Sequence, residues 1–168
     1  MLKVRRHFLE IKLEEYNEKE LNSPSSFKVV LDNKRNFNIN KFFYKRVGAD
    51  HYWRDRLIWS DNEWEKYVSN KNFETWIMKK NDDLVGFYEK EFHPSLNEVE
   101  LINMGILEEF RGKKLGSFLL SHAIKKTFTT KPLRMWVHTC SLDHKHALQN
   151  YKSKGFNNFK EEVIDFVA

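Results

Sequence analysis

The chain has 168 residues, of which 40% are apolar and 15% aromatic, enough to build one sizeable core but not two. Its single cysteine, Cys140, excludes an internal disulfide and a zinc site made of several cysteines. The 29 basic and 24 acidic residues give a net charge of +5, spread along the chain without the basic stripe that nucleic-acid binders show.

No segment of the sequence predicts a membrane span or a secretory leader. The longest uncharged stretch, 115–124, is too short to cross a bilayer, and no apolar region follows the basic N-terminus. We therefore expect a soluble, cytoplasmic domain with no membrane partner.

The first half of the chain predicts two strands followed by two helices. Apolar and charged residues alternate over 8–14, as in a half-buried strand. Ser60 and Glu63 form a capping-box pattern, which opens a helix. The other elements expected here are a short strand over 27–31 and a helix over 36–47 that ends at Gly48.

The second half predicts an antiparallel meander and then alternating strands and helices. Asp143 is a fitting N-cap for the second of these helices. The expected elements are strands over 73–79, 84–92 and 98–107, a helix over 112–128, a strand over 133–139, a helix over 144–154 and a last strand over 156–167.

The unit from 98 to 139 is a parallel crossover. These elements predict a single-domain α/β fold with a mixed sheet, helices on both faces and the order β-β-α-α-β-β-β-α-β-α-β.

The segment from Glu109 to Ser117 joins a strand to a long helix and contains Gly112 and Gly116. Such a turn aims backbone N–H groups at one point beside the positive end of a helix dipole, which suits a pyrophosphate. An ordinary helix start after a glycine turn is the alternative. Neither the P-loop spacing nor a Gly-x-Gly-x-x-Gly pattern occurs.

Two motifs in this region resemble those of the GNAT superfamily, the acetyl-CoA-dependent N-acetyltransferases. Arg111-Gly-Lys-Lys-Leu-Gly116 resembles the signature Arg/Gln-x-x-Gly-x-Gly/Ala. Ala147-Leu-Gln-Asn-Tyr-Lys-Ser-Lys-Gly-Phe156 matches every fixed position of Ala-x-x-x-Tyr-x-x-x-Gly-Phe. The element order is also that of the family, so the resemblance covers nearly the whole chain.

The chain departs from the family pattern at three places. Lys114 takes the position of the first motif glycine, and His144 stands where many members carry an asparagine. Only about a dozen residues follow Phe156. The family's last hairpin is therefore expected as a single strand or as one completed by a partner chain.

The resemblance implies a binding site for acetyl-CoA and no metal. Main-chain groups near Thr139 and on the facing strand would hold the pantetheine arm, residues 111–117 would hold the pyrophosphate, and His144 would lie close to the cofactor. The residues implied on the facing strand are Met104, Gly105 and Ile106. Those implied in the pyrophosphate turn are Arg111, Gly112, Lys113, Lys114, Leu115, Gly116 and Ser117.

The resemblance also implies a general base and a general acid. Glu100 would take the proton of the amine, and Tyr151 would protonate the departing thiolate. Glu98 shares the face of Glu100 and is the rival base. Glu100 as a solvated strand residue and Tyr151 as a helix-face packing residue are the structural alternatives.

The segment Asp50-His-Tyr-Trp-Arg-Asp-Arg-Leu-Ile-Trp59 is the candidate acceptor site. Aromatic rings and carboxylates hold cationic amines by cation–π and charge contacts. The alternative is that the rings pack in the core and the charged residues form a solvated loop. The residues concerned are Asp50, Tyr52, Trp53, Asp55 and Trp59.

A metal site at His138, Cys140, His144 and His146 is not favoured. His144 and His146 are two residues apart on a predicted helix, roughly 200° around its axis, so they cannot chelate one ion together. Cys140 has no base at a spacing that would make it an acyl-transfer nucleophile.

The sequence therefore favours an N-acetyltransferase that moves acetyl from acetyl-CoA to a primary amine by direct attack in a ternary complex. The acceptor would be a small molecule or a peptide, and a homodimer is compatible. One alternative is a GNAT-fold module that binds acyl-CoA without transferring the acyl group. The other is a basic adaptor for RNA or acidic proteins.

Overall fold

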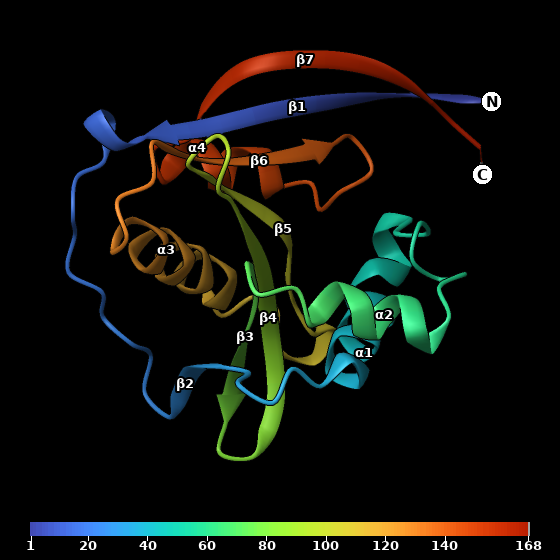
Figure 1. The fold of residues 1–168 in the computed structure, drawn as a ribbon, viewed down its shortest axis with the longest axis horizontal. Coiled ribbons are helices and arrows are strands. Elements are labelled where there is room, and N and C mark those ends of the chain that lie inside the picture. Colours follow the sequence, from blue (N-terminus) through green and yellow to red (C-terminus); the bar gives the residue numbers. More distant parts are fainter. Residues whose placement is uncertain (168) are drawn as a thin grey trace.

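The computed structural model describes residues 1–167 and contains one seven-stranded mixed sheet with helices on both faces (Figure 1). The predicted order of strands and helices is confirmed. The strands are β1 (Leu2–Lys12), β2 (Phe27–Leu31), β3 (Phe73–Lys80), β4 (Asp83–His93), β5 (Glu98–Ile106), β6 (Arg134–Cys140) and β7 (Asn157–Phe166). The helices are α1 (Phe37–Gly48), α2 (Asp61–Val68), α3 (Leu115–Phe128) and α4 (Ala147–Ser153), with single 3-10 turns at Leu13–Glu15, Ala49–His51 and Glu108–Phe110.

The strands lie in the order β2-β3-β4-β5-β6-β1-β7, and only the β5–β6 pair is parallel. The first strand of the chain therefore lies inside the sheet, between β6 and β7. The last strand is single, as expected, and its neighbour is β1 of the same chain (Figure 1).

Each face of the sheet has its own core. On one face, Phe43 and Val47 of α1 pack against Ile77 and Phe87 of β3 and β4. On the other face, α3 packs a row of apolar side chains that includes Leu119 against the strands. Burial of both cores is the main stabilising contribution to such a layered fold.

The capping box predicted at Ser60 and Glu63 is confirmed. The Ser60 side chain accepts a hydrogen bond from Glu63 N at 3.2 Å while Glu63 Oε2 accepts one from Ser60 N, so the capping box is complete. Asn36, which the sequence placed inside the first helix, is its N-cap in the structure, because its side chain accepts from Asn38 N at 3.1 Å.

Candidate acetyl-CoA site

The two parallel strands β5 and β6 separate after three residue pairs. Glu98 pairs with Arg134, Val99 with Met135 and Glu100 with Trp136, and no ladder joins the strands beyond that point. The remaining main-chain groups that β5 and β6 turn toward each other are therefore available to a ligand. A cavity of about 910 Å³ opens where the strands diverge.

One end of the cavity is the turn that leads into α3. Gly112 has φ of +83°, and Lys114, the N-cap of α3, has φ of 60° and ψ of 19°. The first helical hydrogen bond runs from Phe118 N to Lys114 O. The N–H groups of the preceding positions therefore lie ahead of the helix ladder, at its positive end. Leu115, Gly116 and Ser117, which carry these groups, line the cavity.

Arg111 anchors this turn. Its Nε donates to Ile106 O at 3.1 Å, and its guanidinium lies 3.5 Å from Asp50. Lys113 lies outside the cavity lining, with its ammonium 5.8 Å from the centre of the Phe110 ring. Of the seven residues predicted to surround a pyrophosphate, Lys113 is therefore the one that does not line the cavity.

Met104, Gly105 and Ile106 of β5 line the middle of the cavity opposite Thr139 of β6. Gly105 also brings α1 close to β5, since a Cβ at this position would overlap the Val47 side chain. An elongated ligand with an anionic end fits this arrangement of free main-chain groups and helix N-terminus.

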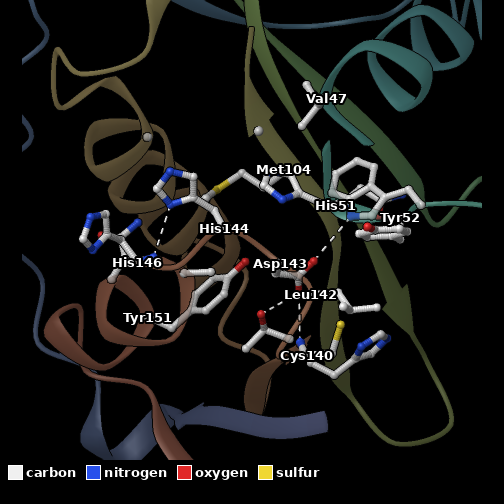
Figure 2. Close-up of a pocket in the computed structure, with 18 of the residues that line it drawn as sticks. Val47, His51, Tyr52, Met104, Cys140, Leu142, Asp143, His144, His146 and Tyr151 are labelled. Carbon is white, nitrogen blue, oxygen red and sulfur yellow. Dashed lines mark hydrogen bonds between the residues drawn. The ribbon is translucent and has the colours of Figure 1, made fainter. Parts of the chain in front are cut away.

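Tyr151 of α4 reaches into the cavity and directs its hydroxyl toward Asp143 (Figure 2). Its ring packs edge-on against Phe156 with the ring centres 5.6 Å apart. Burial raises the pKa of the Tyr151 phenol above its ordinary value, and the negative charge of Asp143 adds to this shift. The phenol is therefore a proton donor throughout the neutral range.

Asp143 does not cap a helix, contrary to the prediction. Its Oδ2 accepts hydrogen bonds from Thr139 Oγ1 at 2.6 Å and from Cys140 N at 2.9 Å, and its Oδ1 accepts one from Trp53 Nε1 at 3.4 Å (Figure 2). Because these groups engage the carboxylate, α4 begins at Ala147 rather than at 144. Asp143 thus joins the end of β6 to the loop between α1 and α2.

The predicted acceptor residues divide into two groups. Tyr52, Trp53 and Asp55 line the cavity, whereas Asp50 pairs with Arg111 outside it. Trp59 also lies outside the lining, where its ring centre is 5.0 Å from the Arg56 guanidinium. His144 lines the cavity on the side of Tyr151.

A family comparison identifies this architecture. Residues 34–156 match the model of the Acetyltransferase (GNAT) family. The chain belongs to this family. No curated protein matches the sequence.

Solved GNAT structures share the fold at low sequence identity. A GCN5-related N-acetyltransferase from Sphaerobacter thermophilus superposes with a TM-score of 0.71 at 11% identity, over 95% of this chain and 50% of that one. An aminoglycoside acetyltransferase from an uncultured soil metagenomic sample gives 0.66 at 13%, over 85% and 95%. The ribosomal-protein-S18-alanine N-acetyltransferase from Escherichia coli gives 0.63 at 18%, over 80% and 79%.

In this GNAT chain the two glutamates favoured as bases lie outside the cavity lining. Glu100 accepts a hydrogen bond from His93 Nε2 at 3.1 Å. Glu98 binds Arg134 Nε at 2.7 Å and accepts from Trp136 Nε1 at 3.1 Å. Both glutamates belong to the paired part of β5, before the strands separate.

The GNAT cavity has one wall that the sequence did not indicate. On the side of the α1–α2 loop, the cavity is lined by Val4 and Arg6 of β1 and by Ile164 and Phe166 of β7. The rings of Phe166 and Tyr52 lie 5.8 Å apart, so the C-terminal strand contacts that loop. No local sequence pattern predicts this wall, because it forms only when β1 and β7, at the two ends of the chain, pair with each other.

The described part of the chain contains neither a membrane-spanning helix nor a metal-binding cluster. No helix within residues 1–167 is long and apolar enough to cross a membrane. Over the same residues, no cluster of three or more His, Cys, Asp or Glu side chains is arranged to hold a metal ion.

Proposed function

We propose that this GNAT protein transfers acetyl from acetyl-CoA to a primary amine by direct attack in a ternary complex. The divergence of β5 and β6 beyond Glu100 and Trp136 is the observation that carries the proposal. It opens one cavity that reaches from the N-terminus of α3 to the α1–α2 loop, so both substrates fit in it together.

The residues present fit acetyl-CoA. The α3 turn with Lys114 would hold the pyrophosphate, and β5 with Thr139 would hold the pantetheine arm by main-chain hydrogen bonds. Bound acetyl-CoA supplies a thioester whose carbonyl carbon accepts a nucleophile. Tyr151 of α4 lines this cavity, and its protonated phenol would give a proton to the leaving sulfur.

Direct attack is favoured over transfer through an acyl-cysteine. Cys140 lines the cavity, but burial raises the pKa of its thiol, and Asp143 adds to the shift. Little thiolate is present at neutral pH, and the thiolate is the nucleophilic form.

The α1–α2 loop would bind the acceptor. Tyr52 and Trp53 offer aromatic faces and Asp55 a carboxylate, which together suit an ammonium group. The aminoglycoside and ribosomal-protein enzymes that share the fold are named for amine acceptors of two very different sizes. We therefore propose an amine-bearing small molecule or peptide as the acceptor.

A module that binds acyl-CoA without transferring it is the second candidate. It is favoured by one observation, that no glutamate is found among the cavity-lining residues described by the structure. Such a module would lack the carboxylate base expected on β5.

Two successive measurements test the proposal. Acetyl-CoA should raise the Tm, because a ligand that binds only the folded state stabilises it, whereas acetate and adenine should not. Spermidine, kanamycin and an Ala-initiated hexapeptide are then offered with acetyl-CoA while free CoA thiol is followed. Amine-dependent thiol release supports acetyl transfer. A raised Tm without release from any amine supports the binding module, and no shift at millimolar acetyl-CoA contradicts both.

A further inference from the structure

We propose that His138 is the general base that takes the proton from the acceptor amine. This assignment rests on the proposed acetyl transfer and deepens it, since it replaces the missing glutamate with a group that the cavity does contain.

His138 lies on β6 just beyond the last residue that pairs with β5. Strand alternation places it opposite to its neighbours Val137 and Thr139, which are buried. The imidazole lines the cavity, with its ring centre 5.6 Å from that of Phe8. The side chain keeps accessible surface, although protein atoms surround it, because it faces the cavity.

Charged groups from four segments act on the imidazole. These groups are Arg6 of β1, Asp55 of the α1–α2 loop, Asp143 after β6 and Glu162 of β7. Removal from bulk water lowers the pKa of His138 most strongly and Arg6 lowers it further, while the three acids oppose the shift. The ring is therefore neutral at pH 7 and has a free nitrogen lone pair to accept a proton.

Other acidic groups in the cavity are less suited to this role. Asp143 already accepts three hydrogen bonds, and Asp165 lies 3.7 Å from the ammonium of Lys3. Asp55 lines the cavity among the residues assigned to the acceptor, so its carboxylate is expected to bind the ammonium rather than to take its proton. Its negative charge instead suits the attraction of the ammonium toward His138.

The other cavity histidines are His51, in the α1–α2 loop, and His144 and His146, in the segment before α4. The ring centres of His51 and His144 are 6.0 Å apart, and those of His144 and His146 are 5.3 Å apart. His144 and His146 lie beside Tyr151 (Figure 2). They are therefore on the side assigned to the leaving thiolate rather than to the amine.

The step balances with these two groups. The bound ammonium first loses one proton to solvent, which leaves a lone pair on the amine nitrogen. That nitrogen forms a bond to the acetyl carbonyl carbon as His138 takes a second nitrogen-bound proton, and the carbon–sulfur bond breaks. The sulfur leaves with the bonding pair and takes the proton of Tyr151. Solvent then returns a proton to Tyr151 and removes one from His138.

Two variants test His138, measured with whichever of the three amines the wild type acetylates fastest. His138→Gln keeps most of the side-chain volume but cannot take up a proton. We expect kcat to fall about 10²- to 10⁴-fold, with unchanged affinity for acetyl-CoA and loss of the acidic limb of the kcat–pH profile. His138→Ala should regain activity with added imidazole.

His7→Gln is the matched control, since His7 lies on the neighbouring strand β1, outside the cavity lining, and should keep wild-type kcat. Glu100→Gln is measured alongside. A wild-type acidic limb in His138→Gln, or its loss in Glu100→Gln instead, would overturn the assignment while acetyl transfer stands. Failure of the wild type to acetylate any of the amines would contradict the proposed function itself.

Discussion

The phenol of Tyr151 keeps its proton unless a strong base forms beside it, because burial and Asp143 both raise its pKa. A departing thiolate is such a base. Tyr151→Phe keeps the packing against Phe156 and removes only the hydroxyl. We expect kcat to fall roughly 10- to 1000-fold with little change in acetyl-CoA affinity, as judged from initial rates and binding titrations.

Asp143→Asn gives the complementary result for the same phenol. Removal of the negative charge lowers the pKa of Tyr151, so the alkaline limb of the kcat–pH profile should move to lower pH. An unchanged limb in Asp143→Asn, together with full turnover by Tyr151→Phe when chemistry limits the rate, would show that the tyrosine serves packing alone.

A second prediction at this scale concerns His122 of α3. Burial is the largest cause that lowers its pKa to about 4, and its Nδ1 lies 3.0 Å from the Tyr88 hydroxyl. The unfolded chain takes up the proton near pH 6.5, whereas the folded protein resists it down to about pH 4. Stability should therefore be complete above pH 6.5 and decrease as the pH falls toward 4. Thermal melts across this range should show a shallower decrease in Tm for His122→Leu; an equal slope would contradict the assignment.

At the scale of elements, the α1–α2 loop depends on a buried ion pair. Arg56 lies 3.1 Å from Glu89, which is 1% exposed and also accepts hydrogen bonds from Asn40 and Asn103. Arg56→Met leaves this carboxylate without its cation. We expect a loss of about 3 to 5 kcal/mol in the free energy of unfolding by urea.

Lys41→Met is the matched control for this pair. The Lys41–Asp61 pair has a similar N–O distance, 3.0 Å, but Asp61 is mostly exposed. Its removal should cost less than about 1 kcal/mol. Equal losses for the two variants would show that burial of Glu89 has no special consequence.

The α3 turn supports a prediction about Lys114. Its left-handed backbone is strained for a lysine, so Lys114→Gly should raise the free energy of unfolding by about 0.5 to 1 kcal/mol. The same change removes a cation from the cavity lining. Acetyl-CoA should then bind more weakly and with a smaller salt dependence.

Lys113→Ala serves as the control for Lys114, because Lys113 lies outside the lining. The salt dependence of acetyl-CoA binding to Lys113→Ala should equal that of the wild type. Equal affinities for all three proteins at every salt concentration would mean that Lys114 does not contact the ligand.

At the scale of the whole molecule, the first strand of the chain is an inner strand of the sheet. Residues 6–10 of β1 pair with β6 on one side and β7 on the other. Leu9 in this stretch is 0% exposed, whereas Leu2 near the chain end is 50% exposed. Leu9→Ala should cost about 2 to 5 kcal/mol in urea unfolding and Leu2→Ala less than about 0.5 kcal/mol.

Hydrogen exchange gives an independent check on β1. Amides of β1 that pair within the sheet should be protected like those of the other inner strands, although they belong to the N-terminus. Rapid exchange in β1, or equal effects of the two leucine variants, would place this strand outside the cooperative core.

The sequence by itself determined the elements, the family and much of the candidate acetyl-CoA site. Strand alternation, the capping box at Ser60 and the two motifs at 111–116 and 147–156 all act over a few residues, so they can be recognised locally. The same motifs placed the α3 turn and Tyr151, and both line the cavity.

The tertiary structure decided which residues face the cavity. Glu100 and His138 both lie on strands beside the cavity. Glu100 belongs to the paired part of β5 and lies outside the cavity lining, whereas His138 lies beyond the point where β5 and β6 separate and lines the cavity. Asp143 looked like a helix cap because its partner Trp53 is 90 positions away. Arg5 and Glu161 pair across 156 positions, and such pairings of chain ends leave no local periodicity to read. Short-range patterns therefore specify elements, while the cavity walls follow from hydrogen bonds between distant strands.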